Sequence, residues 1–267
     1  KSARSIEEQY WAVLEKRGRT FARSKSLPLP ILPGGTKYWV DDTYSNKRIH
    51  VLKIDLTNPK VSLRASKPDE RGITPTDFAK KVGAVAAING DFFTSSQSFR
   101  ATGPAVGQGV RWQNSYNRSD WSYLACTGSN SCIIDPQQST APPAGQYGTV
   151  VGGSPVLVEP GAGWYLKPGD NGCAPSCSEP APRTAVGLSA DKKTMWWVVA
   201  EGRQGSVSGL SLYDLAGVFK KLNAKWAVNL DGGGSTGMVL NKKLINRRPS
   251  GEQAERKVGN SLGIIIR

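Results

Sequence analysis

The fold is decided by WAVNLDGGGS at residues 226–235. This stretch begins with a run typical of a buried strand and ends with Asp231, three glycines and a serine. A second apolar run, at residues 84–88, leads in the same way into NGD at residues 89–91. Ligands of sheet proteins gather where strands end, so we expect the two turns to border one site.

Short alternating segments elsewhere predict a sheet protein. They predict strands at residues 37–40, 48–56, 61–65, 184–188 and 194–200. A short helix is expected after Thr74, an N-cap residue followed by proline, and a second helix after Ser211, with its apolar residues on one face. The predicted fold class is α+β, with a mixed and largely antiparallel sheet core, a few flanking helices and long functional loops.

The first 35 residues differ in character from the rest. Apolar residues at helical spacing predict an amphipathic helix over residues 5–21, and the prolines of residues 26–35 predict an extended connector. We therefore divide the chain into an N-terminal helix and connector at residues 1–35 and a single domain at residues 36–267. Within that domain, residues 94–182 are rich in Gly, Ser, Pro and Gln, which indicates either functional loops or weakly patterned structure.

Composition excludes several classes of protein. A chain of 267 residues with 38% hydrophobic residues can bury a substantial core, and it has no apolar run long enough to span a bilayer. The 35 Lys and Arg against 21 Asp and Glu give a net charge of +14. This charge favours a polyanionic neighbour such as an anionic polysaccharide, a phosphorylated glycan, a lipid surface or nucleic acid.

A single histidine, His50, limits the catalytic classes that are open to the chain. Ser-His-Asp hydrolysis, Cys-His proteolysis and most zinc sites need at least one suitably placed imidazole. His50 lies within an alternating run at residues 48–54, so we interpret it as a structural strand residue.

The four cysteines form two close pairs, Cys126 with Cys132 and Cys173 with Cys177. Their spacing fits local disulfides better than a zinc ribbon. Disulfides indicate an oxidising compartment, so we expect a secreted, periplasmic or cell-envelope protein. Because no apolar leader is present at Lys1, we expect any signal peptide to have been removed already.

Five motifs occur together and in a particular order. They are NGDFF at 89–93, PRTAVG at 182–187, EGRQG at 201–205 with SGLSL at 208–212, NLDGGGS at 229–235 and RKVGN at 256–260. In these motifs the chain resembles, over residues 50–266, the phosphodiester glycosidases. That family includes the mannose-6-phosphate uncovering enzyme, an N-acetylglucosamine-1-phosphodiester α-N-acetylglucosaminidase, and many exported bacterial proteins.

The resemblance implies hydrolysis of a sugar 1-phosphodiester, of the N-acetylglucosamine-1-phosphate type, which leaves a phosphomonoester on the other partner. The positions that match the family's motifs are Asn89, Arg183, Thr184, Asp231, Gly232, Gly233, Gly234 and Ser235. Three departures stand beside them. The family usually has Asp where this chain has Glu201, it fills the position of Asp91 variably, and STGM at residues 235–238 is not its usual sequence.

The chemistry of such a reaction suggests roles for these residues. Cleavage of the C1–O bond passes through an oxocarbenium-like state, so a carboxylate should attack or stabilise C1 or activate water, and Asp231 is our candidate. A phosphate leaving group needs a cationic clamp more than a proton, which suits Arg183, with Arg203 as second choice. Glu201 is either the second carboxylate or an exposed glutamate at the end of a hairpin.

Structural alternatives remain for several of these residues. Asn89 could bind a sugar hydroxyl or satisfy loop backbone, and Arg183 could be an ion-pair partner of Asp231. The three glycines could expose N–H groups to a ligand or form an ordinary tight turn. The sequence requires no cofactor, although Asp231, Asp91 and Asn89 are ligand types for Ca²⁺ or Mg²⁺.

Two other functions compete with hydrolysis. A non-catalytic polysaccharide or cell-wall binding module could retain the fold, and the departures at Glu201 and Gly237 motivate that reading. Nucleic-acid binding is disfavoured, because the basic residues are dispersed and Trp196 and Trp197 lie in a predicted core strand. The expected partner is therefore an anionic glycan or cell-wall polymer.

Overall fold

The protein is described here from a computed structural model. The structure describes residues 32–41, 46–113, 121–135, 142–143, 145–161, 166 and 177–267. The helix predicted over residues 5–21 and most of the connector lie outside these residues. Among the helices of the described part, none is both long and apolar enough to cross a membrane.

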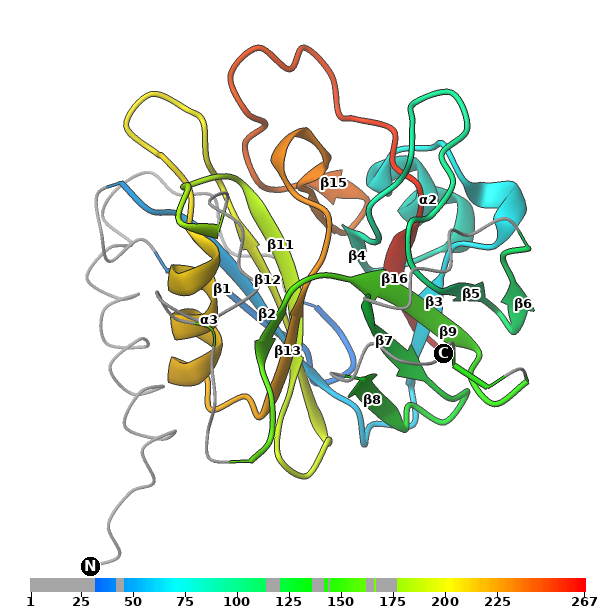
Figure 1. Cartoon of the computed structure of the whole chain (residues 1–267). Coiled ribbons are helices and arrows are strands. Elements are labelled where there is room, and N and C mark those ends of the chain that lie inside the picture. Colours follow the sequence, from blue (N-terminus) through cyan, green and yellow to red (C-terminus); the bar gives the residue numbers. More distant parts are fainter. Residues whose placement is uncertain are drawn as a thin grey trace, which may run out of the picture.

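The largest sheet, sheet A, has six strands in the order β1, β2, β12, β11, β13 and β10. Their bounds are β1 Lys37–Asp41, β2 Ile49–Asp55, β10 Val156–Val158, β11 Arg183–Leu188, β12 Thr194–Ala200 and β13 Trp226–Asn229. Helix α3 (Leu212–Lys221) packs on one face of this sheet, as Figure 1 shows. Ser211 caps the helix as predicted, because its hydroxyl accepts a 3.0 Å hydrogen bond from the Asp214 N–H.

The second sheet, sheet B, faces sheet A across the main core and has five strands in the order β15, β14, β4, β16 and β3. Their bounds are β3 Val61–Ala65, β4 Ala86–Asn89, β14 Met238–Leu240, β15 Lys243–Leu244 and β16 Ser261–Ile266. Helix α2 (Pro75–Val82) covers the other face of sheet B and is capped by Thr74, again as predicted. The order of layers is therefore α3, sheet A, sheet B, α2.

A third sheet, sheet E, occupies much of residues 94–182, for which the sequence predicted either functional loops or weakly patterned structure. It has five strands in the order β6, β5, β9, β7 and β8. Their bounds are β5 Ala105–Gly107, β6 Val110–Arg111, β7 Ser122–Cys126, β8 Cys132–Asp135 and β9 Thr149–Gly153. Every strand pairing among the described residues is antiparallel, so the predicted α+β class with a largely antiparallel core is confirmed.

Two short 3₁₀ turns complete the regular elements of the described chain. They are η1 (Pro68–Glu70) and η3 (Gly233–Ser235). The second turn contains the last two of the three glycines and Ser235. Gly232 before it has extended backbone, and Gly233 adopts a φ of +59° that favours glycine.

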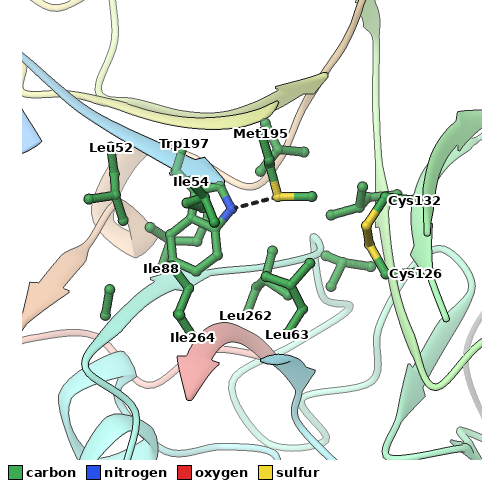
Figure 2. Packing of buried hydrophobic residues seen from close by; sticks show 14 of the residues in the cluster. Leu52, Ile54, Leu63, Ile88, Cys126, Cys132, Met195, Trp197, Leu262 and Ile264 are labelled. Atoms are coloured by element: carbon green, nitrogen blue, oxygen red, sulfur yellow. Dashed lines mark hydrogen bonds between the residues drawn. A yellow bond between two sulfur atoms is a disulfide. The ribbon is translucent and has the colours of Figure 1, made fainter. Parts of the chain in front are cut away.

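The main core lies between sheets A and B and reaches sheet E. The indole of Trp197 is fully buried there and donates to the Met195 sulfur at 3.2 Å, as Figure 2 shows. Its neighbour Trp196 points to the opposite face of β12, toward α3, because side chains alternate along a strand. A disulfide between Cys126 and Cys132 lies at the sheet E side of this core and confirms the first predicted pair.

The second predicted cysteine pair is described only in part. Cys177 is disulfide-bonded, and its predicted partner Cys173 lies outside the described residues.

We predict that Trp197→Ala lowers the free energy of unfolding by about 3 to 5 kcal/mol, because it removes a large side chain from a closed core. Denaturant unfolding followed by fluorescence or circular dichroism measures the change. Val110→Ala, at an exposed position in β6, is the control and should stay within about 0.5 kcal/mol of the original protein. A loss below about 1 kcal/mol for Trp197→Ala would contradict the packing described here.

Candidate functional site

The two turns that the sequence placed at one site do meet, through the side chain of Asn89. The Asn89 amide donates from Nδ2 to the backbone carbonyl of Asp231 at 2.7 Å. Its Oδ1 accepts from the Thr184 hydroxyl at 2.7 Å and from the Gly237 N–H at 3.1 Å. Asn89 has no exposed surface, so these contacts are those of a residue that satisfies loop backbone.

The carboxyl of Asp231 lies immediately after β13 and is only partly exposed. Its Oδ1 accepts the Gly232 N–H at 2.8 Å, and the Ser235 hydroxyl also bonds to the carboxyl. Burial raises the pKa of Asp231 above its usual value, while the Ser235 and Gly232 hydrogen bonds and the charge of Arg256 oppose that rise. The ionisation of the Asp231 carboxyl therefore depends on its hydrogen bonds to Ser235 and Gly232 and on the charge of Arg256.

Asp91 is a second carboxyl near Asp231, and it is completely buried. Its Oδ2 accepts the Gly103 N–H at 2.9 Å, whereas its Oδ1 has no hydrogen-bond partner among the described residues. Burial raises the pKa of Asp91 well above its usual value, and the negative charge of Asp231 raises it further. With no exposed surface, Asp91 is placed beside the site and does not face solvent.

Three arginines lie beside the triple-glycine turn, two through their guanidinium groups and Arg183 through its backbone. A side chain at Gly233 would lie 3.3 Å from the Arg203 guanidinium, and one at Gly234 would overlap the Arg256 guanidinium. The Cα of Arg183 lies 3.7 Å from the position that a side chain on Gly232 would take. The absence of side chains on this turn is therefore what lets the cations approach its backbone.

Arg183 follows Pro182 into β11, next to the segment that carries Asp231. Its Nε donates to the Leu210 carbonyl at 3.1 Å and its Nη2 to the Glu179 carbonyl at 3.0 Å. Burial lowers the pKa of Arg183, and the charge of Arg203 lowers it further, so the two guanidinium groups are close enough to repel each other. An anion placed between them would relieve this repulsion.

Glu201 is buried rather than exposed at the end of the hairpin, which makes that structural alternative wrong. Its Oε1 accepts from His50 Nε2 at 2.8 Å and from the Arg247 N–H at 2.8 Å, and the Arg48 guanidinium lies 3.6 Å away. Burial opposes ionisation of Glu201, but these partners outweigh it and hold the pKa of the carboxyl below its usual value. Glu201 is thus a charged anchor within the core.

His50 has the structural role predicted for it. It is buried in β2, and its second ring nitrogen, Nδ1, hydrogen-bonds the Tyr38 hydroxyl at 2.7 Å. Both ring nitrogens are therefore engaged within the fold, one by Tyr38 and the other by Glu201.

Two residues at the site were not assigned a role from the sequence. Asn260 accepts the Asp91 N–H on its Oδ1 at 2.6 Å and the Gly90 N–H on its carbonyl at 2.9 Å, so it holds the turn after β4. Arg256 forms an ion pair with Glu252 beside Gly234. Both belong to the RKVGN motif at residues 256–260, which is one of the five motifs of the resemblance but does not indicate what these side chains contact.

The oxygen-bearing side chains considered for a divalent cation are engaged in other contacts. Asn89 Oδ1 accepts two hydrogen bonds, and one oxygen each of Asp91 and Asp231 accepts a backbone N–H. Within the described ranges, no group of three or more His, Cys, Asp or Glu side chains is arranged as a set of metal ligands.

Fold and site together define a layered antiparallel α+β protein in which a carboxylate and a cation-lined glycine turn lie where strands of two sheets end. A family model described as phosphodiester glycosidase matches residues 82–265, so the chain belongs to the phosphodiester glycosidase family. A search of curated proteins gave no match.

Solved structures share this fold at low sequence identity. The catalytic domain of zebrafish N-acetylglucosamine-1-phosphodiester α-N-acetylglucosaminidase, auto-inhibited by its pro-peptide, is 20% identical with a TM-score of 0.66, over 91% of this chain and 86% of that one. A hypothetical protein from Synechocystis is 17% identical with a TM-score of 0.64; the match covers 91% of this chain but only 65% of that protein. A putative exported protein from Burkholderia pseudomallei is 20% identical with a TM-score of 0.54, over 82% and 74% of the two chains.

The buried carboxyl of Asp91 gives a prediction for the pH dependence of stability. Its folded-state pKa is raised, so between the unfolded-state pKa near 4 and the folded-state pKa the native protein keeps a proton that the unfolded chain loses. Stability should therefore fall as pH rises through this window. Asp91→Asn removes this term, so its stability relative to the original protein should grow with pH, by at most about 1.4 kcal/mol per pH unit.

Denaturant unfolding at pH 4, 6 and 8 measures this difference. Asp69→Asn, at an exposed carboxyl, is the matched control and should show no such growth. A stability difference between Asp91→Asn and the original protein that does not change with pH would contradict the raised pKa of the buried Asp91 carboxyl.

Proposed function

We propose that this protein is a glycosidase that hydrolyses sugar 1-phosphodiester bonds, of the N-acetylglucosamine-1-phosphate type, in glycans or cell-surface polymers. The observation that carries the proposal is the Asp231 carboxyl at the head of a glycine turn that the Arg203 and Arg256 guanidinium groups approach. A carboxylate for C1 and cations for a phosphate are the two needs of this reaction. Membership of the phosphodiester glycosidase family supports this reaction class.

Asp231 is the catalytic carboxylate in this proposal. It acts on C1 of the sugar, either directly or by activating water, as the bond from C1 to the phosphate oxygen breaks. Water supplies the new oxygen on C1, and the phosphate leaves as a monoester that remains on the other partner. Ser235 and the Gly232 N–H hold the carboxyl in position, and Asn89 fixes the backbone that carries it.

The phosphate is held by the arginines in this proposal. Arg203 lies close enough to Arg183 for its charge to lower the pKa of Arg183. A guanidinium group binds phosphate well because two of its N–H groups can donate to two phosphate oxygens at once. Thr184 is buried and donates its hydroxyl to Asn89, so in this proposal it supports the substrate-binding turn at Gly232–Gly234 from beneath. Asp91 is buried beside the site and interacts electrostatically with Asp231. Glu201 anchors the backbone at Arg247.

The proposed setting is an oxidising compartment outside the cytoplasm, with an anionic glycan or cell-wall polymer as partner. The Cys126–Cys132 disulfide and the disulfide-bonded Cys177 support that setting. The high positive charge supports an anionic partner.

We predict that Asp231→Asn lowers kcat on an α-N-acetylglucosamine 1-phosphodiester by about 10² to 10⁴-fold, the range typical of a lost acid–base or nucleophilic group. Release of the free sugar with time is the measurement, and Asp69→Asn is the control. A variant that retains most of the original rate would take Asp231 out of the mechanism. If the original protein binds the substrate without releasing sugar, the fold serves as a binding module instead.

Arg183→Lys tests the phosphate clamp, because it keeps the charge and loses the planar fork. We expect kcat/KM for the phosphodiester to fall by about 10 to 100-fold. Arg247→Lys is the matched control, since Glu201 binds the backbone N–H at that position. Thermal unfolding of both variants separates a lost clamp from a lost fold, and full activity of Arg183→Lys would assign the phosphate to other residues.

A further inference from the structure

A second basic hollow lies along the outer edge of sheet B. Its volume is about 360 Å³, and its polar lining comes from Ser62, Arg64, Gln108, Thr127, Thr149 and Arg267. None of these residues belongs to the candidate site described above. We call this hollow the β3 groove, because β3 is the edge strand of its sheet and forms one wall.

The β3 groove lies at the far end of β16 from the candidate site. Ser261 at the start of β16 pairs with Asn89, whereas Ile266 at its end pairs with Val61 beside the groove. Five residues of antiparallel strand span about 17 Å. The two places are therefore separate, and a chain of a few sugar units could reach from one to the other.

The edge of β3 is not available to an added strand. Asn130 donates from Nδ2 to the Val61 carbonyl at 2.7 Å, and its Oδ1 accepts the Leu63 N–H at 3.4 Å. The Thr149 hydroxyl donates to the Leu63 carbonyl at 3.2 Å. Because side chains of sheet E already occupy these backbone groups, a ligand of the groove is recognised by side chains rather than by strand pairing.

The charge of the groove is positive and incompletely balanced. Arg64 is nine-tenths buried, with Nη2 bonded to Glu70 at 2.6 Å and Nε without a hydrogen-bond partner among the described residues. Arg267 is exposed at the rim and reaches the Ser62 hydroxyl at 3.4 Å. Arg64 is therefore already paired with a carboxylate, and the described lining holds no Asp or Glu side chain, so an anion entering the groove would meet the Arg267 guanidinium at the rim.

The remaining lining suits a saccharide. Hydroxyl and amide groups from Ser62, Thr127 and Gln108 match sugar hydroxyls, and the described lining holds no aromatic ring on which a nucleobase could stack. Three glycines of the wall, Gly109, Gly128 and Gly148, face open space, since a Cβ added there would meet no described atom within 4 Å. The volume is within the range of ordinary small-ligand sites and exceeds that of one sugar ring.

We propose that the β3 groove binds a phosphate-bearing sugar unit of an anionic glycan, at a distance from the unit that is cleaved. Binding at the groove does not require catalysis. The tighter binding of a polymeric substrate that the groove would provide rests on the proposed function. A polymer held at both places would gain from the linkage, because the second contact becomes intramolecular once the first has formed.

Nuclear magnetic resonance of the ¹⁵N-labelled full chain tests the binding directly. The probe is N-acetylglucosamine 1-phosphate, with N-acetylglucosamine and inorganic phosphate titrated separately. We expect saturable shifts of the Gly128 and Gly148 amides with the sugar phosphate, and binding at least tenfold weaker with either comparison ligand. Absence of these shifts, or equal binding of neutral sugar or of phosphate alone, would overturn the proposal.

Variants locate the binding. Arg267→Glu should weaken the response of the groove amides at least tenfold, while Lys60→Glu, an equal charge change at an exposed position next to the groove, should change it less than twofold. Gly128→Tyr adds a side chain where there is open space and should block the probe in a folded protein. Loss of binding in Lys60→Glu equal to that in Arg267→Glu would reduce the effect to general charge and overturn the site.

Kinetics connect the groove to the reaction. Arg267→Glu should raise KM about tenfold for a polymer of sugar-phosphate units and leave KM for a single-unit phosphodiester unchanged. An equal effect on both substrates would overturn the role in polymer binding. If the original protein hydrolyses neither substrate, the proposed function fails, and the resonance titrations still decide whether the groove binds.

Discussion

The side-chain amide of Asn89 is the interaction on which the rest of the site depends. It stands at the end of β4 in sheet B and bonds to Thr184 of sheet A, to the Asp231 carbonyl and to the Gly237 N–H. A buried amide is costly unless its groups are paired, so the ends of the two sheets are held where these partners can reach it. The position of the Asp231 backbone is therefore fixed by a contact between sheets and not by its own strand alone.

The electrostatics of the site follow from that arrangement. Joining the sheet ends brings Asp91 near Asp231, and burial then raises the pKa values of both carboxyls, with the charge of Asp231 raising that of Asp91. On the other side of Asp231 the glycine turn admits Arg203 and Arg256 to the backbone, as side chains on the turn would not. One buried contact thus places the Asp231 carboxyl near both a buried carboxyl of raised pKa and the arginines of the glycine turn.

The sequence predicted the elements whose signals are local. The Thr74 and Ser211 caps, the hairpin of β11 and β12 and the strand at β13 depend on residues close in the chain, and all are present. Sheet E escaped prediction because its strands are two to five residues long and one of them is β9, TVVGG, whose order comes from pairing with distant strands. The burial of Glu201 could not be foreseen either, since its partner His50 is 151 residues away.

The contacts of Glu201 are compatible with a carboxylate one methylene longer than the Asp that the resemblance implies at this position. Its Oε1 accepts hydrogen bonds from His50 Nε2 and from the Arg247 N–H. The residues that follow Glu201 bind the same loop, because Gln204 donates to the Arg248 carbonyl and the Arg203 carbonyl accepts from the Ser250 N–H. This loop, at residues 245–260 in the upper part of Figure 1, carries Arg256 to the glycine turn. The extra methylene of Glu is compatible with such a role, because a carboxylate that anchors a loop must meet an N–H and an imidazole, and small shifts of loop and ring can accommodate it. A carboxylate that attacked C1 would have no such freedom, since bond formation requires closely set atoms.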